Sequence, residues 1–295
     1  MLGINLSPAA FYQSIQAIHT PLLDFFFISI SFLGSEPIYI LLLSTIFWNL
    51  DKRFGIRLAT LFLCSMGLNS ILKNFFLIAR PIGQPGIRSL YTSSAGGYSF
   101  PSGHSQGAAT FYPYLWQLRP KLVWKIFGIV MILVIGFSRL YLGVHWPGDV
   151  LGGYILGWGS VLIFQVIDKR LFKLPFSLPL KLSLAIILPL LFLPIYHSKE
   201  GLLLIGFIIG LTAGYFLEDH FLDYRERTKI FISLFKTLFG LVVLGLWFLI
   251  WYRLTSSFSW LYLPISVVGG FWTSLGAPYV FRLFGWEASY QLQKS

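Results

Sequence analysis

Residues 122–149 read LVWKIFGIVMILVIGFSRLYLGVHWPGD. The first part of this stretch, residues 122–143, is almost entirely apolar, and about 20 such residues are enough to cross a bilayer as one helix. Polar residues gather at its end: Ser138, Arg139, His145 and Asp149. Pro147 lies among them and disfavours a helix that continues through the whole stretch. The stretch therefore predicts a transmembrane helix that ends in a polar turn at a membrane face.

The rest of the chain repeats this apolar pattern. The chain has 295 residues, of which 56% are hydrophobic and 11% are charged, whereas a soluble protein carries about 25% charged residues. We therefore predict an all-α protein, a polytopic bundle of about nine transmembrane helices. The predicted spans are 22–49 (one long helix, kinked near Pro37), 55–78, 102–118, 122–143, 150–167, 180–197, 201–218, 230–252 and 259–282.

The segment 1–21 precedes the first predicted span. Ser7-Pro8 is typical of a helix start, so we expect a short external or interfacial helix, either lying on the membrane surface or packed against the protein. The first 51 residues contain no Lys or Arg. The basic leading region of a cleavable signal peptide is therefore not expected here.

The basic residues indicate the orientation. The net charge is +11, but most Lys and Arg residues lie in short gaps between apolar runs, which indicates membrane topology and argues against nucleic-acid binding. Placing the gap after the first span in the cytoplasm puts 16 of the 22 basic residues on that side. The N-terminus is then outside and the C-terminus in the cytoplasm. The six external basic residues are Lys73, Arg80, Arg88, Arg139, Lys199 and Arg253.

Three polar blocks fall on this external side and are predicted to converge. They are Lys73 with Arg80-Pro81, then Pro101-Ser102-Gly103-His104, then Ser138-Arg139 with His145 and Asp149. The external loop 82–100 carries Arg88, which is a candidate for contact with a substrate head group. This loop is expected to be either a cover over the site or a plain connection.

The first block supplies cations. Lys73 and Arg80 are seven residues apart, about two helical turns, so both can point the same way if the helix continues to Pro81. Lys supplies a point charge, and Arg can bind two phosphate oxygens at once. A cation inside or near a membrane is a functional candidate by default.

The second block opens a predicted helix. A helix N-terminus offers free N–H groups and a partial positive charge to an anion. Ser102 can either cap this helix or bind a phosphate oxygen. Gly103 permits close approach of the backbone to a ligand, and His104 lies within the first turn.

The third block joins a base to a residue that orients it. Asp149 can reach back to His145 across the turn, hold one ring nitrogen and leave the other free to attack. A His–Asp pair in a loop can equally be structural.

These blocks resemble the signature of the type 2 phosphatidic acid phosphatase family, related to the vanadium haloperoxidases, at Lys73, Arg80, Pro81, Pro101, Ser102, Gly103, His104, Ser138, Arg139, His145 and Asp149. The resemblance implies a bacterial plasma-membrane phosphatase that forms a phosphohistidine on His145. It implies that Asp149 orients His145 and that His104 protonates the leaving group. It implies phosphate binding by Lys73, Arg80, Ser102, Gly103 and Arg139, with no metal and no cofactor.

The resemblance covers residues 22–168, which we expect to form the phosphatase core. The substrate would be a membrane lipid: phosphatidic acid, phosphatidylglycerophosphate or polyprenyl pyrophosphate. The same phosphohistidine would also serve a lipid phosphotransferase, and the extra spans leave a lipid or head-group transporter as a third possibility. The oligomeric state is not indicated.

Residues 169–295 are predicted to add four transmembrane helices of unknown role. Glu218, Asp219, His220 and Asp223 favour a solvated charged loop over a metal site. Three glycines at four-residue spacing, Gly206, Gly210 and Gly214, predict a close helix contact within the chain or between chains.

Overall fold

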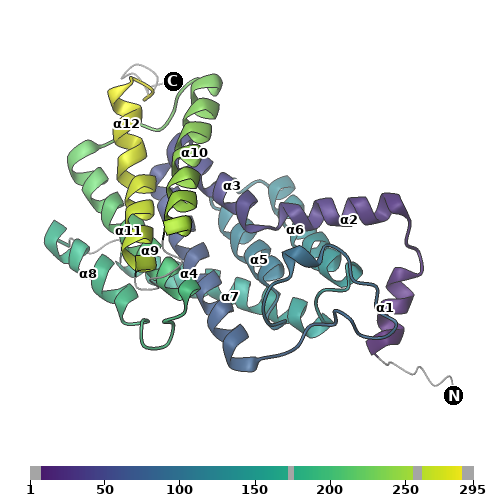
Figure 1. Cartoon of the computed structure of the whole chain (residues 1–295). Helices are drawn as coiled ribbons and strands as arrows, with labels where there is room; N and C mark the ends of the chain where they lie inside the picture. The colour runs from purple at the N-terminus through teal and green to yellow at the C-terminus, as the bar shows by residue number, and fades with distance from the viewer. Residues whose placement is uncertain (1–7, 172–175, 255–260, 288–295) are drawn as a thin grey trace. The chain divides into compact units, whose positions relative to one another are not determined.

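A computed structural model describes residues 8–171, 176–254 and 261–287 (Figure 1). The described residues form helices and connections with no strand, so the predicted all-α class is confirmed. The helices are α1 (Pro8–Gln16), α2 (Pro21–Leu33), α3 (Glu36–Asn49), α4 (Lys52–Phe76), α5 (Gly103–Leu115), α6 (Leu122–Tyr141), α7 (Pro147–Leu171), α8 (Leu178–Leu190), α9 (Lys199–Leu217), α10 (Ile230–Leu254), α11 (Tyr262–Phe271) and α12 (Ala277–Leu283).

The predicted count of nine spans is not confirmed. In the described part of the chain, five helices are long and apolar enough to cross a membrane: α4, α6, α7, α9 and α10. The bent pair of α1 and α2 would make a sixth. Two predicted spans are represented by α5 and α8, which have only 13 residues each, whereas a straight crossing needs about 20.

The first predicted span, 22–49, is two helices instead of one kinked helix. α2 ends at Leu33, and α3 begins at Glu36. Pro37 therefore occupies the second position of α3, where a missing N–H removes no hydrogen bond. Gly34 lies between the helices, and a Cβ there would come within 2.6 Å of Ile135 on α6. The break thus depends on a residue small enough to pack closely on α6.

The N-terminal helix α1 is packed against the protein, which decides between the two alternatives for this segment. Tyr12 is fully buried and Gln16 is nearly so. The Gln16 side chain donates to the carbonyl oxygens of Arg88 and Tyr141 at 2.7 and 2.9 Å. Residues 1–7, including the predicted start at Ser7, lie outside the described residues.

The chain forms two compact units. The first comprises Met1–Tyr39 and Cys64–Asp168, and the second comprises Ile40–Leu63 and Lys169–Ser295. All three polar blocks belong to the first unit.

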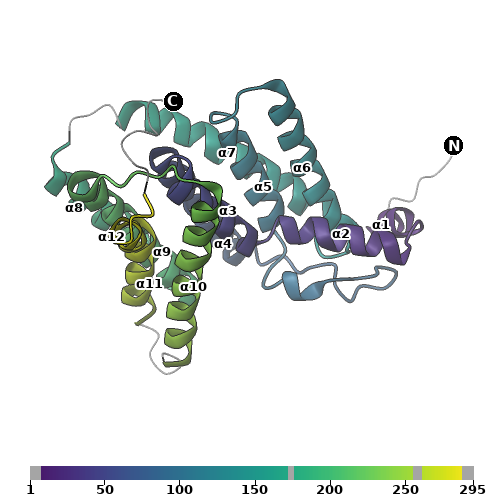
Figure 2. The same ribbon diagram turned by 90° about the horizontal axis from the view of Figure 1, so that it is seen from above.

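In the first unit, α7 lies against the start of α5. A Cβ on Gly153 would come within 2.7 Å of the Ser102 carbonyl oxygen, and a Cβ on Gly157 within 2.6 Å of the Gln106 carbonyl oxygen. α6 packs beside α5, and α2 packs on α6; Figure 2 shows the three helices from above. The glycines on α7 thus allow the first turns of α5 and α7 to meet, and these turns carry the second and third polar blocks.

In the second unit, the three glycines of α9 lie against α11 and the π-helical turn that follows it. A Cβ would come within 2.3 Å of the Leu263 carbonyl oxygen at Gly206, 1.9 Å of the Val267 carbonyl oxygen at Gly210, and 2.3 Å of Ser274 Oγ at Gly214. The predicted close contact therefore occurs within the chain.

The acidic cluster of the second unit is solvated only in part, because His220 and Asp223 are exposed and Glu218 is not. Glu218 is fully buried and pairs with Lys52 Nζ at 3.0 Å. Asp223 pairs with the same nitrogen at 3.2 Å. The Glu218 carboxylate also accepts from the Tyr224 amide at 2.6 Å. The buried Lys52–Glu218 pair thus joins the start of α4 to the end of α9, whereas the Asp223 side chain stays 76% exposed.

Candidate active site

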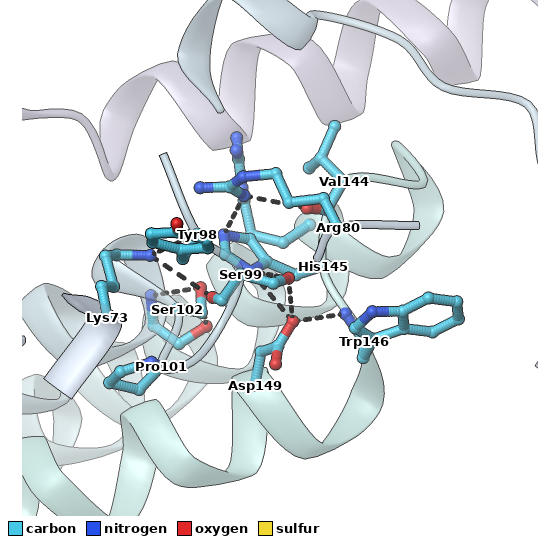
Figure 3. A network of polar contacts seen from close by, with 12 residues as sticks. Lys73, Arg80, Tyr98, Ser99, Pro101, Ser102, Val144, His145, Trp146 and Asp149 are labelled. Atoms are coloured by element: carbon cyan, nitrogen blue, oxygen red, sulfur yellow. Dashed lines mark hydrogen bonds and ion pairs between the residues drawn. The ribbon is translucent and has the colours of Figure 1, made fainter. Parts of the chain in front are cut away.

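His145 and Asp149 lie together at the start of α7. His145 Nδ1 is 3.2 Å from Asp149 Oδ2, and both side chains are nearly fully buried. The same carboxylate oxygen accepts from the Trp146 amide at 2.7 Å, as an acidic residue three positions after a helix cap commonly does. Figure 3 shows this arrangement. The local start of α7 therefore aims the carboxylate at the imidazole.

The turn before α7 requires a glycine. Gly143 has φ +64, and a Cβ on it would come within 2.4 Å of the Arg88 carbonyl oxygen. Only glycine adopts this conformation without strain while another backbone lies so close. The turn brings His145 back toward the first polar block.

Arg80 reaches the other end of the His145 ring (Figure 3). Its Nη1 is 2.9 Å from His145 Nε2 and donates to the Val144 carbonyl oxygen at 2.9 Å. Its remaining nitrogens donate to the carbonyl oxygens of Gly96 and Gly97 at 2.7 and 2.9 Å. Arg80 is not on a helix, as the two-turn spacing suggested, because α4 already ends at Phe76.

Lys73 lies in the last turn of α4 and points to the segment just before the second block. Its Nζ donates to the carbonyl oxygens of Tyr98 and Ser99 at 2.7 and 3.3 Å. Lys73 and Arg80 therefore hold the backbone of residues 96–99 between them. An incoming anion would compete with these carbonyl oxygens for both cations.

Arg139 is the most deeply placed cation of the site. Its side chain is fully buried on α6. It donates to Ser31 Oγ on α2 and, at 2.9 Å, to Ser94 Oγ. Its Nε has no hydrogen-bond partner among the residues that the structure describes. A buried donor without a partner is costly, so this atom remains available to a ligand.

The second block has the geometry of a helix start. Ser102 caps α5, and its Oγ accepts from the Ser105 amide at 3.4 Å and the Ser105 hydroxyl at 3.0 Å. Gly103 is the first residue of α5. His104 follows it, and its Nε2 is buried without a partner in the described part of the chain. The block thus combines a capping serine with a histidine nitrogen that has no protein partner.

Arg88 has a partner of its own on α2. Its Nη1 donates to Asp24 Oδ1 at 3.0 Å, and its Nη2 donates to Asp24 Oδ2. Tyr141 Oη donates to the same carboxylate at 2.8 Å. This pair holds the loop 82–100 to α2, and contact of Arg88 with a head group stays a prediction.

Sequence reasoning missed several residues at the site. Ser99 Oγ donates to Asp149 Oδ2, Tyr12 Oη donates to the His145 carbonyl oxygen, and Ser31 and Ser94 bind Arg139. Ser99 lies just before the Pro101 block, and this proximity was the only available signal for it. For Tyr12 and Ser31, far away in sequence, there was none.

The charges of the site favour an anion and a neutral imidazole. The positive charges of Lys73, Arg80 and Arg139 all act on His145. Burial lowers the pKa of His145 well below its usual value, and the positive charges of Arg80, Arg139 and Lys73 lower it further. With Asp149 at Nδ1, the proton of the neutral ring belongs on Nδ1 and the lone pair on Nε2. Such a ring can attack an electrophile bound by the cations.

Comparisons with known proteins identify the family of this chain. Residues 54–172 match the PAP2 superfamily, and residues 202–289 match the PAP2 superfamily phosphatase transmembrane extension. The undecaprenyl-diphosphatase of Sulfolobus acidocaldarius is 34% identical over 39% of this chain and 56% of its own length. The phosphatidylglycerophosphatase B of Bacillus subtilis is 31% identical over 57% of this chain and 87% of its own.

Among solved structures, a transmembrane PAP2-type phosphatidylglycerolphosphate phosphatase from Bacillus subtilis matches 58% of this chain and 87% of its own. The sequence identity is 27%, and the TM-score is 0.47. The first family match, 54–172, includes all three polar blocks, and the second, 202–289, runs from within α9 past the end of α12. The chain belongs to the PAP2 superfamily of phosphatases and carries its transmembrane extension.

Proposed function

We propose that this protein hydrolyses a lipid phosphate or lipid pyrophosphate through a phosphohistidine on His145. The observation that carries the proposal is the His145 ring, which has Asp149 at Nδ1 and Arg80 at Nε2. One end is held by a carboxylate, and the other carries the lone pair beside a cation that suits a phosphate oxygen. A substrate phosphate would bind Arg80 in place of His145 Nε2. Its phosphorus would then lie next to that nitrogen.

The residues account for each step of the reaction. Nε2 attacks phosphorus, the bond from phosphorus to the leaving oxygen breaks, and His104 gives that oxygen a proton. Water then attacks the phosphohistidine, His104 takes a proton from the water, the P–N bond breaks, and phosphate leaves. Lys73, Arg80, Arg139 and the N-terminus of α5, with Ser102 and Gly103, stabilise the charge on the phosphate oxygens. These fixed positive groups support a reaction that needs no metal.

The membrane context supports a lipid substrate. Lys73, Arg139 and Asp149 lie at the ends of the long apolar helices α4, α6 and α7. The acyl or prenyl chain of a lipid would stay in the bilayer while its head group enters the site. The distribution of Lys and Arg supports an external site, with the N-terminus outside and the C-terminus in the cytoplasm. The named activities of the relatives, on undecaprenyl diphosphate and phosphatidylglycerophosphate, support the same substrate class.

Phosphate release by the purified protein tests this function. We expect release from at least one of phosphatidic acid, phosphatidylglycerophosphate and polyprenyl pyrophosphate in detergent micelles, undiminished by EDTA. Labelled phosphate found on a second lipid, and not in water, would identify a phosphotransferase instead. No turnover of any of these lipids by folded protein would refute the proposal.

The role of His104 predicts a difference between substrate classes. An alkoxide leaving group needs a proton, whereas a phosphate leaving group is stable without one. His104→Asn should therefore lower kcat for a phosphate monoester by about 10²–10³-fold, within the range of general acid catalysis, and should lower kcat for a pyrophosphate much less. The ratio of the two kcat values measures this difference. Equal losses on both substrates would argue against proton donation by His104.

The lowered pKa of His145 predicts where activity is lost in acid. The attacking lone pair exists only in the neutral ring, and burial with three nearby cations disfavours protonation. Activity should therefore persist below the ordinary histidine pKa of about 6.5 and disappear as the pH falls through the lowered value. Arg80→Gln removes one of these cations, so the acid limb of kcat/KM should move to higher pH. A wild-type limb at or above pH 6.5, or one unmoved by Arg80→Gln, would contradict this.

A further inference from the structure

We propose that Ser99 is a positioning residue for the attack, and that its hydroxyl holds the Asp149 carboxylate in line with the His145 ring. This inference rests on the proposed function, because it assigns Ser99 to the same reaction. Ser99 acts through Asp149 and is given no contact with the substrate.

The side-chain geometry places Ser99 at the centre of the pair (Figure 3). Its Oγ donates to Asp149 Oδ2 and lies 3.4 Å from His145 Nδ1. Asp149 Oδ2 also receives the Trp146 amide and faces His145 Nδ1. Three donors thus meet on one carboxylate oxygen, and two of them, the amide and the ring, come from residues within four positions of Asp149. Ser99 supplies the one donor from elsewhere in the chain.

The backbone of Ser99 is held on both sides, which keeps the residue within reach of Asp149. The Ser99 amide donates to the Ile78 carbonyl oxygen at 2.7 Å, and its carbonyl oxygen accepts from Lys73 Nζ at 3.3 Å. Ser99 is also fully buried. One residue therefore joins the end of α4, which carries the first polar block, to the carboxylate of the third block.

Loss of the hydroxyl should affect the chemical step and not substrate binding. With two donors in place of three, the carboxylate is held less firmly and His145 is aligned less often for attack. Hydrogen bonds to charged groups are worth enough to predict a fall in kcat of about 10- to 100-fold for Ser99→Ala. KM should change by less than about threefold, because Ser99 is given no contact with the substrate and its loss leaves ground-state binding unchanged.

Ser89→Ala is the matched control. Ser89 is a half-buried serine of the same loop, and its Oγ donates to the Gly143 carbonyl oxygen at 3.1 Å, outside the His–Asp pair. We expect near wild-type kcat from it. Ser99→Cys keeps nearly the same volume but offers a weaker donor, so its kcat should fall between those of wild type and Ser99→Ala. Ser99→Cys also serves if the alanine variant does not fold.

The experiment measures kcat, KM and the single-turnover rate of phosphohistidine formation in the full-length protein, on the lipid that the wild type turns over fastest. The proposal requires slower phosphohistidine formation in Ser99→Ala, with KM nearly unchanged. It is overturned if Ser99→Ala loses no more activity than Ser89→Ala, if KM rises while kcat is kept, or if Ser99→Cys is fully active. An inactive wild type would instead refute the proposed function.

Discussion

His145→Gln is expected to lower phosphate release by roughly 10⁴-fold or more, the largest effect of any single change at this site. The amide is close in size to the imidazole, so the buried turn between α6 and α7 should keep its packing. It has no nitrogen lone pair able to attack phosphorus, so the covalent route is lost. Only the binding energy and the charges of Lys73, Arg80 and Arg139 remain to assist water.

The measurement has two parts. Steady-state phosphate release gives the size of the loss, and a rapid quench with labelled lipid under alkaline conditions detects the phosphohistidine, which acid would hydrolyse. His197→Gln provides the control, since His197 is an exposed histidine between α8 and α9. Label retained on the His145→Gln protein would place the nucleophile elsewhere.

Asp149→Asn is expected to lower kcat by about 10³–10⁴-fold, as the loss of an orienting carboxylate does in a nucleophile–base pair. The reason lies in the three donors that meet at Asp149 Oδ2. An amide oxygen can replace part of this acceptor, but it cannot stabilise the positive charge that grows on His145 during attack. If the amide nitrogen faces His145 instead, it favours the wrong tautomer, with the proton on Nε2.

The control for this variant is Asp51→Asn. Asp51 Oδ1 accepts from the Phe54 amide at 2.8 Å at the start of α4, and asparagine caps helices as well as aspartate does. We therefore expect unchanged stability and unchanged kcat from Asp51→Asn. Thermal unfolding in detergent should show Asp149→Asn folded as well. A loss below tenfold in the folded Asp149→Asn protein would mean that Asp149 does not orient His145.

Some features of this site were readable from short stretches of sequence. His145 and Asp149 are four residues apart, and Pro147 begins a helix between them, so the local backbone alone brings the two side chains together. Ser102 was read as a possible cap from the residues beside it, and it caps α5. The apolar runs likewise predicted membrane helices, because the length of such a run can be seen within one short stretch of sequence.

Several contacts between distant parts of the chain were not indicated by the sequence. Spacing suggested a helical Arg80, yet the helix ends at Phe76 and Arg80 reaches a histidine 65 residues away. The pairing of Arg88 with Asp24 on α2 was likewise not indicated by the sequence. Span lengths failed for a related reason: α5 is only 13 residues long, and tertiary packing buries its apolar side chains where hydropathy indicated a full crossing.

The polar turn 138–149 thus has local contacts and long-range contacts, and the two kinds have different causes. The helix that ends at Tyr141, the start of α7 at Pro147 and the pairing of His145 with Asp149 follow from residues near one another in the chain. The partners that complete the turn, Arg80 at Nε2 and Ser99 at the carboxylate, come from distant parts of the chain and are placed there by the tertiary structure. Local backbone preferences act over a few residues, whereas a serine or an arginine binds whichever acceptor the packed helices place within reach.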